Sequence, residues 1–141
     1  MIDIQHLMFD TISRGVEAID PAICVTDVYN EQNAKFPCIT VEQKNSVPYR
    51  RMNTADSAEN YATVTFQVTA YSDKMDTAKM ECLNLLKMVD TIIQGKGFRR
   101  THLSEAFNIS RTIFRRYARY EAIVRAPVQN GEDTVYEIYR R

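Results

Sequence analysis

The stretch Tyr61–Tyr71, YATVTFQVTAY, decides the fold expected for this chain. Along it, small or apolar residues alternate with polar or tyrosine residues. One face carries Ala62, Val64, Phe66, Val68 and Ala70, and the other carries Tyr61, Thr63, Thr65, Gln67, Thr69 and Tyr71. Successive side chains of a β-strand point to opposite faces of the sheet. The alternation therefore predicts a strand in an antiparallel sheet with one buried face and one polar face.

Two segments with helical periodicity can cover the buried face. Residues 3–19 place apolar side chains three and four positions apart, and Asp20–Pro21 ends the pattern. Residues 74–94 repeat the pattern. Asp73 is the expected N-cap of this helix, and Gly95 and Gly97 are expected to end it. Each helix has one apolar stripe, so we expect both to pack on the same face of the sheet.

The remaining elements are predicted to be strands. The expected strands are residues 22–30, 36–43, 112–126 and the C-terminal TVYEIYRR, with a short strand or loop after Phe98. Asn130–Gly131 is a strong hairpin-turn signal, which pairs the last two strands. The sequence thus predicts one α+β domain over residues 1–141: a mostly antiparallel sheet, two helices on one face, a long loop and a C-terminal β-hairpin.

The long loop is predicted at residues 44–60, which follow neither a helical nor a strand period. Unpatterned loops of this length within a compact domain are uncommon and often functional. Apolar, aromatic and arginine side chains stand out in its polar setting: Val47, Tyr49, Arg50, Arg51 and Met52. We interpret these residues as an arm that grips a neighbouring subunit. The alternative is a mobile hairpin tip.

Composition and motifs argue against several classes of function. Lys plus Arg is 18 and Asp plus Glu is 18, so the chain lacks the basic excess typical of nucleic-acid binders. Three cysteines without metal-site spacing predict free thiols in a reducing, cytoplasmic setting. There is no expected signal peptide, membrane span, phosphate-binding loop or nucleophile motif, and His6 and His102 stand alone. We therefore expect no enzyme activity, no metal and no cofactor.

Basic and aromatic residues interleave in Thr112–Val124, TIFRRYARYEAIV. A strand period places Arg116 on the core face as the only charge there. The opposite face carries the candidate site residues Arg115, Tyr117, Arg119 and Glu121. This face is either a solvated surface with weak cross-strand pairs or a surface used in assembly or DNA contact.

The order of these elements resembles that of the tail terminator, or tail-completion, proteins of long-tailed bacteriophages, also labelled minor capsid or head–tail joining proteins. The resemblance covers about residues 1–125. It rests on an amphipathic first helix, a Phe-Pro strand start, a strand ending TAYSD, a helix ending near GKGF, and an R-x-x-R-Y strand at Arg116–Tyr120. The C-terminal hairpin matches the pattern least well.

The resemblance implies a small structural subunit of the virion that assembles in the host bacterial cytoplasm. Six copies would form a ring that caps the tail tube, stops its polymerisation and docks the head connector, while DNA passes through the lumen without specific binding. The expected partners are therefore other copies of this chain, the tail tube protein and a connector or neck protein. Alternatives are another neck or head-completion protein of similar fold, or a small nucleic-acid-binding module, with an enzyme as the third possibility.

Overall fold

The computed structural model describes residues 4–28, 35–48, 61–74, 76–105, 113–130 and 133–139. The chain order is α1 (Gln5–Ile19), β1 (Cys24–Thr26), β2 (Cys38–Pro48), β3 (Tyr61–Ser72), α2 (Ala78–Gln94), β4 (Arg99–Glu105), β5 (Phe114–Asn130) and β6 (Asp133–Tyr139). The strands form one sheet in the order β1-β2-β3-β5-β4, and β6 pairs with β5 beyond the end of β4. β1 and β2 are parallel, whereas all other neighbours are antiparallel.

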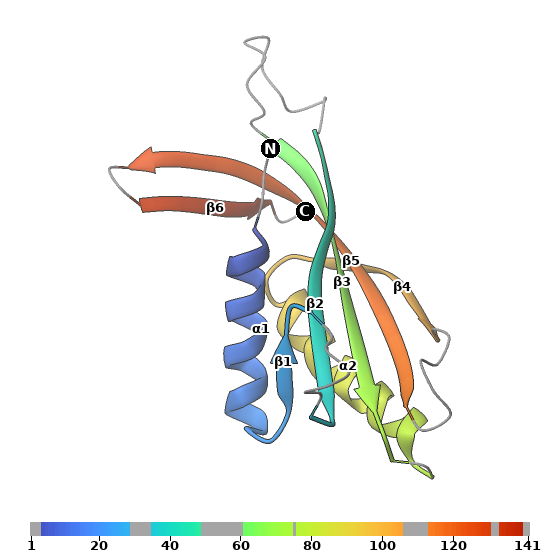
Figure 1. Ribbon diagram of the computed structural model, residues 1–141. Helices are drawn as coiled ribbons and strands as arrows, with labels where there is room; N and C mark the ends of the chain where they lie inside the picture. Colours follow the sequence, from blue (N-terminus) through green and yellow to red (C-terminus); the bar gives the residue numbers. More distant parts are fainter. Residues whose placement is uncertain are drawn as a thin grey trace.

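Both helices cover the same face of the sheet (Figure 1). α1 packs on β1, β2 and α2, and α2 packs on β3, β5 and β4. The predicted α+β class, with two helices on one face of a mostly antiparallel sheet, is therefore confirmed.

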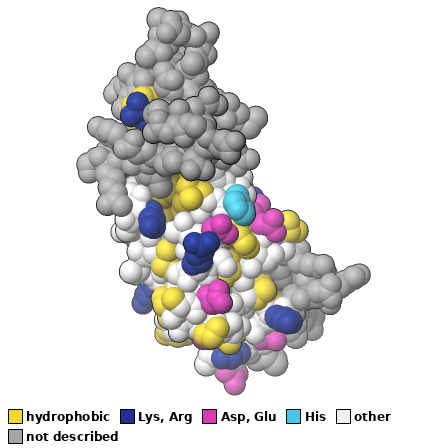
Figure 2. Space-filling view, turned by 90° about the vertical axis from the view of Figure 1, so that its left-hand side faces the viewer, with side chains coloured by type: hydrophobic (Ala, Val, Ile, Leu, Met, Phe, Trp, Pro, Cys, Tyr) yellow, Lys and Arg dark blue, Asp and Glu magenta, His cyan; other side chains and the backbone are white. Residues whose placement is uncertain are grey.

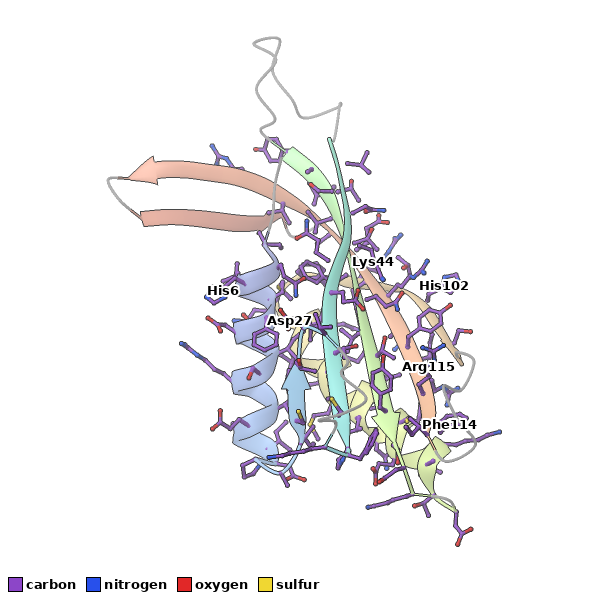
Figure 3. All side chains as sticks on the ribbon, in the orientation of Figure 1. His6, Asp27, Lys44, His102, Phe114 and Arg115 are labelled. Atoms are coloured by element: carbon purple, nitrogen blue, oxygen red, sulfur yellow. The ribbon has the colours of Figure 1, made fainter. Side chains whose placement is uncertain are left out.

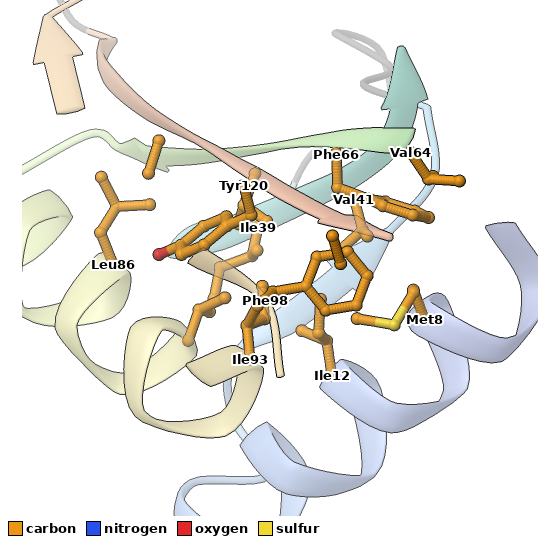
Figure 4. Packing of buried hydrophobic residues seen from close by; sticks show 14 of the residues in the cluster. Met8, Ile12, Ile39, Val41, Val64, Phe66, Leu86, Ile93, Phe98 and Tyr120 are labelled. Carbon is orange, nitrogen blue, oxygen red and sulfur yellow. The ribbon is translucent and has the colours of Figure 1, made fainter. Parts of the chain in front are cut away.

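The hydrophobic core lies between this face and the helices, as Figure 4 shows for Phe66, Phe98, Tyr120, Met8 and Ile12. The rings of Phe66 and Phe98 meet edge to face, with their centroids 5.8 Å apart. Burial of apolar surface of this kind is the main favourable contribution to folding.

The alternation in β3 appears directly in the burial of its side chains. The five residues predicted to face the core are fully buried: Ala62, Val64, Phe66, Val68 and Ala70. On the opposite face, which we call the outer face, Tyr61, Thr63, Thr65 and Gln67 are half-buried. Thr69 and Tyr71 also lie on the outer face but are almost fully buried. The outer face is thus polar in composition without being open along its whole length.

The start of α2 differs from the prediction. The N-cap is Thr77 and not Asp73, and it makes no side-chain capping hydrogen bond. The reason is that β3 continues to Ser72, where the hydroxyl donates to Glu81 Oε1 at 3.0 Å and accepts from the Lys74 amide at 3.4 Å. This turn delays the helix. At the other end, Gly95 is the C-cap and Gly97 has a φ of 99°, which an L-residue rarely adopts.

The predicted loop at residues 44–60 is wrong for its first five residues. Residues 44–48 belong to β2, where Asn45 pairs with Thr65 and Val47 pairs with Thr63 after a bulge between Gln43 and Asn45. β3 supplies the hydrogen-bonding partners that sustain this polar strand, and no local periodicity could reveal them. The rest of the predicted loop, residues 49–60, lies outside the described residues.

The other strand limits also changed. β1 covers only Cys24–Thr26 of the strand predicted at residues 22–30, whose last two residues lie outside the described part of the chain.

Beyond β1, the side chain of Gln5 continues the edge of the sheet. Its Nε2 donates to the Val41 carbonyl at 2.7 Å, and its Oε1 accepts from the Gln43 amide. A backbone residue of a parallel strand next to β2 would make the same two hydrogen bonds, so the Gln5 side chain takes the place of such a residue.

Candidate functional site

The candidate site lies on β5, which is flanked by β3 and β4 (Figure 1). The face assignment from the sequence is confirmed for Ala118, Tyr120 and Val124, which are fully buried under the helices. The intervening residues Arg115, Tyr117, Arg119 and Glu121 lie on the other side of the strand, and we call these four residues the outer-face patch. Arg119 is exposed, whereas the other three are half-buried.

Arg119 is held in place by its neighbours on the sheet. Its Nε donates to Gln67 Oε1 at 3.0 Å, and its guanidinium carbon lies 5.5 Å from the centroid of the Tyr117 ring. Gln67 Nε2 in turn donates to Thr69 Oγ1 at 3.4 Å. These contacts orient the guanidinium while leaving it accessible, an arrangement suited to binding a carboxylate or a phosphate oxygen.

Arg115 lies at the more buried end of the patch, opposite Tyr71 in the β3–β5 register. Burial raises the pKa of the Tyr71 hydroxyl above its usual value, although the neighbouring Thr40 hydroxyl and the Arg115 guanidinium with its positive charge oppose that rise. Arg115 is therefore engaged with a neighbouring side chain and differs from the exposed Arg119. The two arginines do not form one uniform basic surface.

Glu121 marks the other end of the patch. It pairs with Thr65 on β3 and with Arg99 on β4. The register thus brings an acidic and a basic residue side by side across β4 and β5. Ile123 follows on the same face but is only 8% exposed, whereas Arg125, the next residue on that face, is exposed again.

Arg116 occupies the opposite side of β5, as the sequence predicted. It is half-buried, its Nε is buried, and that atom has no hydrogen-bond partner among the residues that the structure describes. Burial, together with the negative charge of Glu81, raises the pKa of the Cys82 thiol to about 12, and the positive charge of Arg116 opposes that rise. Arg116 thus belongs to the environment of α2 and not to the outer-face patch.

Only part of the predicted arm can be placed. Val47 lies on the outer face of β2 and is 53% exposed. It pairs with Thr63, which pairs with Ile123, so Val47 shares the sheet face of the outer-face patch. The arm residues Tyr49, Arg50, Arg51 and Met52 lie outside the described residues.

The described residues contain no group of three or more histidine, cysteine, aspartate or glutamate side chains that could hold a metal ion. His6 on α1 and His102 on β4 lie on opposite sides of the molecule (Figure 3). An open cavity of about 490 Å³ borders β2, where Gln5, Asp27 and residues 42–46 line it. It does not include the outer-face patch.

The sequence missed the residues that complete the patch. Gln67, Thr69 and His102 become its neighbours because β3 and β4 flank β5 in a particular register. The alternation in Tyr61–Tyr71 already placed Gln67 and Thr69 on the outer face, but not opposite Arg119 and Tyr117. Thr101 gave no such signal; its hydroxyl donates to the Arg119 carbonyl at 3.3 Å beside an irregularity in β4.

On the side of the molecule that carries α1, hydrophobic side chains are scattered between charged ones (Figure 2). No helix in the described ranges is both long enough and apolar enough to cross a membrane.

The sequence matches no protein-family model, and a comparison with curated proteins finds no significant similarity.

Proposed function

We propose that this chain is a structural virion protein that forms a ring on the tail tube of a long-tailed bacteriophage. The ring stops tail polymerisation and docks the head connector, and DNA passes through its lumen. The chain assembles in the host bacterial cytoplasm and ends in the neck of the virion. The proposal rests on the resemblance in the order of elements, and the α+β architecture is compatible with it.

The structural observation that supports an assembly role is the orientation of the Arg119 side chain. This guanidinium is exposed on a central strand, yet Gln67 and Tyr117 hold it in one orientation. A surface arginine with no function gains little from such restraint, because exposed pairs contribute only about 0–1 kcal/mol. A preoriented arginine loses less side-chain entropy when it binds a carboxylate of a neighbouring subunit.

The sheet also offers two different margins for contacts between copies. β1 and β2 lie at one side, and β4 lies at the opposite side (Figure 1). A contact between two different surfaces of identical subunits generates a ring when the rotation closes. The balanced charge of 18 basic and 18 acidic residues favours association and suits a lumen through which DNA slides.

The decisive experiment compares Arg119→Glu with Arg14→Glu. Both arginines are exposed, but Arg14 lies on α1, on the helix-covered side of the sheet. We expect Arg119→Glu to abolish rings and tail capping while the subunit stays folded, and Arg14→Glu to behave as the unaltered protein. Mass photometry and electron microscopy on tail tubes measure assembly, and circular dichroism measures folding. If the unaltered protein stays monomeric and never decorates tail tubes, the proposed ring is refuted.

The arm hypothesis needs a variant that respects the observed strands. Replacing residues 49–60 by a short glycine-containing turn leaves β2 and β3 complete. We expect this variant to fold but to fail in ring formation, because the arm would be missing. Rings and tails of normal length would show that the arm is dispensable.

A nucleic-acid-binding module remains the competing function, since Arg119 and Tyr117 also suit contacts with phosphates and bases. Filter binding with single-stranded and double-stranded DNA at increasing salt separates the two. A binding module loses affinity steeply as salt rises, whereas a ring subunit binds weakly at every salt concentration.

A further inference from the structure

The three cysteines fall into two separate environments. Cys82 lies on α2 and faces the sheet, where its sulfur is 3.5 Å from the Ala70 carbonyl oxygen and 3.6 Å from that of Phe114. Cys24 and Cys38 lie on β1 and β2 at the margin of the sheet. The sequence predicted three free thiols without dividing them, so this division comes from the tertiary structure alone.

Cys24 and Cys38 are direct partners in the parallel register of β1 and β2. The Cys24 amide donates to the Pro37 carbonyl at 3.1 Å, which fixes the pairing. Adjacent strands lie about 4.8 Å apart. That spacing falls within the Cα separation of about 4.4–6.8 Å found across disulfides.

The two thiols also interact with each other. Burial is the main cause that raises the pKa of Cys38 to about 12, and the charge and hydrogen bond of Cys24 add to it. Because Cys24 and Cys38 are register partners, their side chains project from the same side of the sheet. Cys82 has no part in this interaction, because it lies on α2, which packs on the opposite face of the sheet.

The accessibility of the two thiols is unequal. Cys38 is only 2% exposed, whereas Cys24 is half-buried. An oxidant in solution thus reaches the sulfur of Cys24 first. Any oxidised form of Cys24 then has the sulfur of Cys38 as its nearest thiol.

We propose that Cys24 and Cys38 form a covalent modification site that hydrogen peroxide converts to a disulfide. The Cys24 thiolate attacks one peroxide oxygen, the O–O bond breaks, and the leaving hydroxide takes up a proton to become water. The sulfur of Cys38 then attacks the resulting sulfenic acid of Cys24; the S–O bond breaks and a second water leaves. The balance is two thiols and one hydrogen peroxide giving one disulfide and two waters.

The disulfide ties β1 to the body of the sheet. β1 has only three paired residues, Cys24–Thr26, so it is the most weakly attached strand of those described. A bond between residues 24 and 38 closes the intervening chain into a loop and reduces the freedom of the unfolded state. The oxidised protein should therefore melt at a higher temperature than the reduced one, and dithiothreitol should reverse the shift. This inference does not depend on the proposed ring.

The test is peptide mapping by mass spectrometry under non-reducing conditions. The full chain is treated with hydrogen peroxide and its remaining thiols are alkylated before and after unfolding. We expect one cross-linked pair of peptides that joins Cys24 to Cys38, with Cys82 alkylated only after unfolding. The thiol count should fall from three to one.

Matched variants complete the experiment. Cys82→Ala should form the same disulfide, whereas Cys24→Ser should form none. An outcome in which Cys24 becomes over-oxidised or joins two chains while Cys38 stays a free thiol would overturn the proposal. So would a disulfide that includes Cys82. Mapping of the unaltered protein decides the matter even if a variant fails to fold.

Discussion

Arg116 and Arg119 lie on the same strand, three residues apart, and have opposite environments. Arg116 faces the helices with its Nε buried, whereas Arg119 faces away from them and is exposed. Because alternate residues of a strand point to opposite sides, two residues an odd number of positions apart must lie on different faces. The comparison teaches that residue type did not decide the role of either arginine. The face on which each one lies decides whether it packs toward the helices or stays on the exposed surface.

The largest expected effect comes from the core face. Phe66→Ala removes a fully buried ring that packs on Phe98, so we expect a loss of about 3–5 kcal/mol in the free energy of unfolding. Gln67→Ala, the next residue along but on the outer face, should cost about 1 kcal/mol or less, because it removes only the exposed hydrogen bond with Arg119 and the long one to Thr69. Urea denaturation measures both losses. Equal losses would contradict the division of the sheet into two faces.

Charge reversal at the two arginines is the next test. Arg116→Glu places a carboxylate in a partly buried site near Cys82 and should destabilise the fold by about 3 kcal/mol. Arg119→Glu should cost about 1 kcal/mol or less, since its lost contacts are exposed. Thermal melting and circular dichroism give the comparison. A sharp loss of structure in Arg119→Glu would make that residue structural and remove the basis of the proposed assembly role.

An effect smaller than those of Phe66→Ala and Arg116→Glu is expected at Tyr120, whose buried hydroxyl donates to Asp90 Oδ1 at 2.9 Å. Tyr120→Phe should cost about 1 kcal/mol at neutral pH, and Tyr117→Phe on the outer face serves as its control. Burial first, and then the hydrogen bond and charge of Asp90, raise the pKa of Tyr120 above its ordinary value of 10.0.

This pKa shift has a defined consequence for the pH dependence of stability. Above pH 10 the unfolded chain releases the Tyr120 proton while the folded protein retains it. Stability is therefore fully present below that pH and falls as the pH rises further. Denaturant titrations at several alkaline pH values should show a shallower fall for Tyr120→Phe. Parallel curves for the variant and the unaltered protein would contradict the assignment.

The sequence predicted the elements that carry a strong period. Tyr61–Tyr71, the two helical stripes and the faces of residues 114–124 all follow from local alternation, and the structure confirms them. The sequence-based prediction of a loop was wrong at residues 44–48, where the β2 strand is polar and gains its stability from pairing with β3. The sequence also misplaced the start of α2, because the Ser72 hydroxyl bonds to Glu81 and prolongs the turn before the helix.

The candidate site was predicted in its residues but not in its surroundings. Arg115, Tyr117, Arg119 and Glu121 were assigned to one face by counting along β5. The contact of Arg119 with Gln67, 52 residues away in the chain, depends on strand order and register. Neither can be read from a single sequence, because many registers satisfy the same alternation.

By itself, then, the sequence determined the α+β class, the buried faces of β3 and β5, and the placement of Arg116 and Arg119 on opposite faces, since these follow from periodicities of 2 and about 3.6 residues along the chain. Only the tertiary structure decided which strands are neighbours. It thereby set Arg119 against Gln67, brought the Gln5 amide to the edge of β2, and placed Cys24 opposite Cys38. These are contacts between residues far apart in the chain, and they depend on how whole elements pack and not on the preference of any one segment.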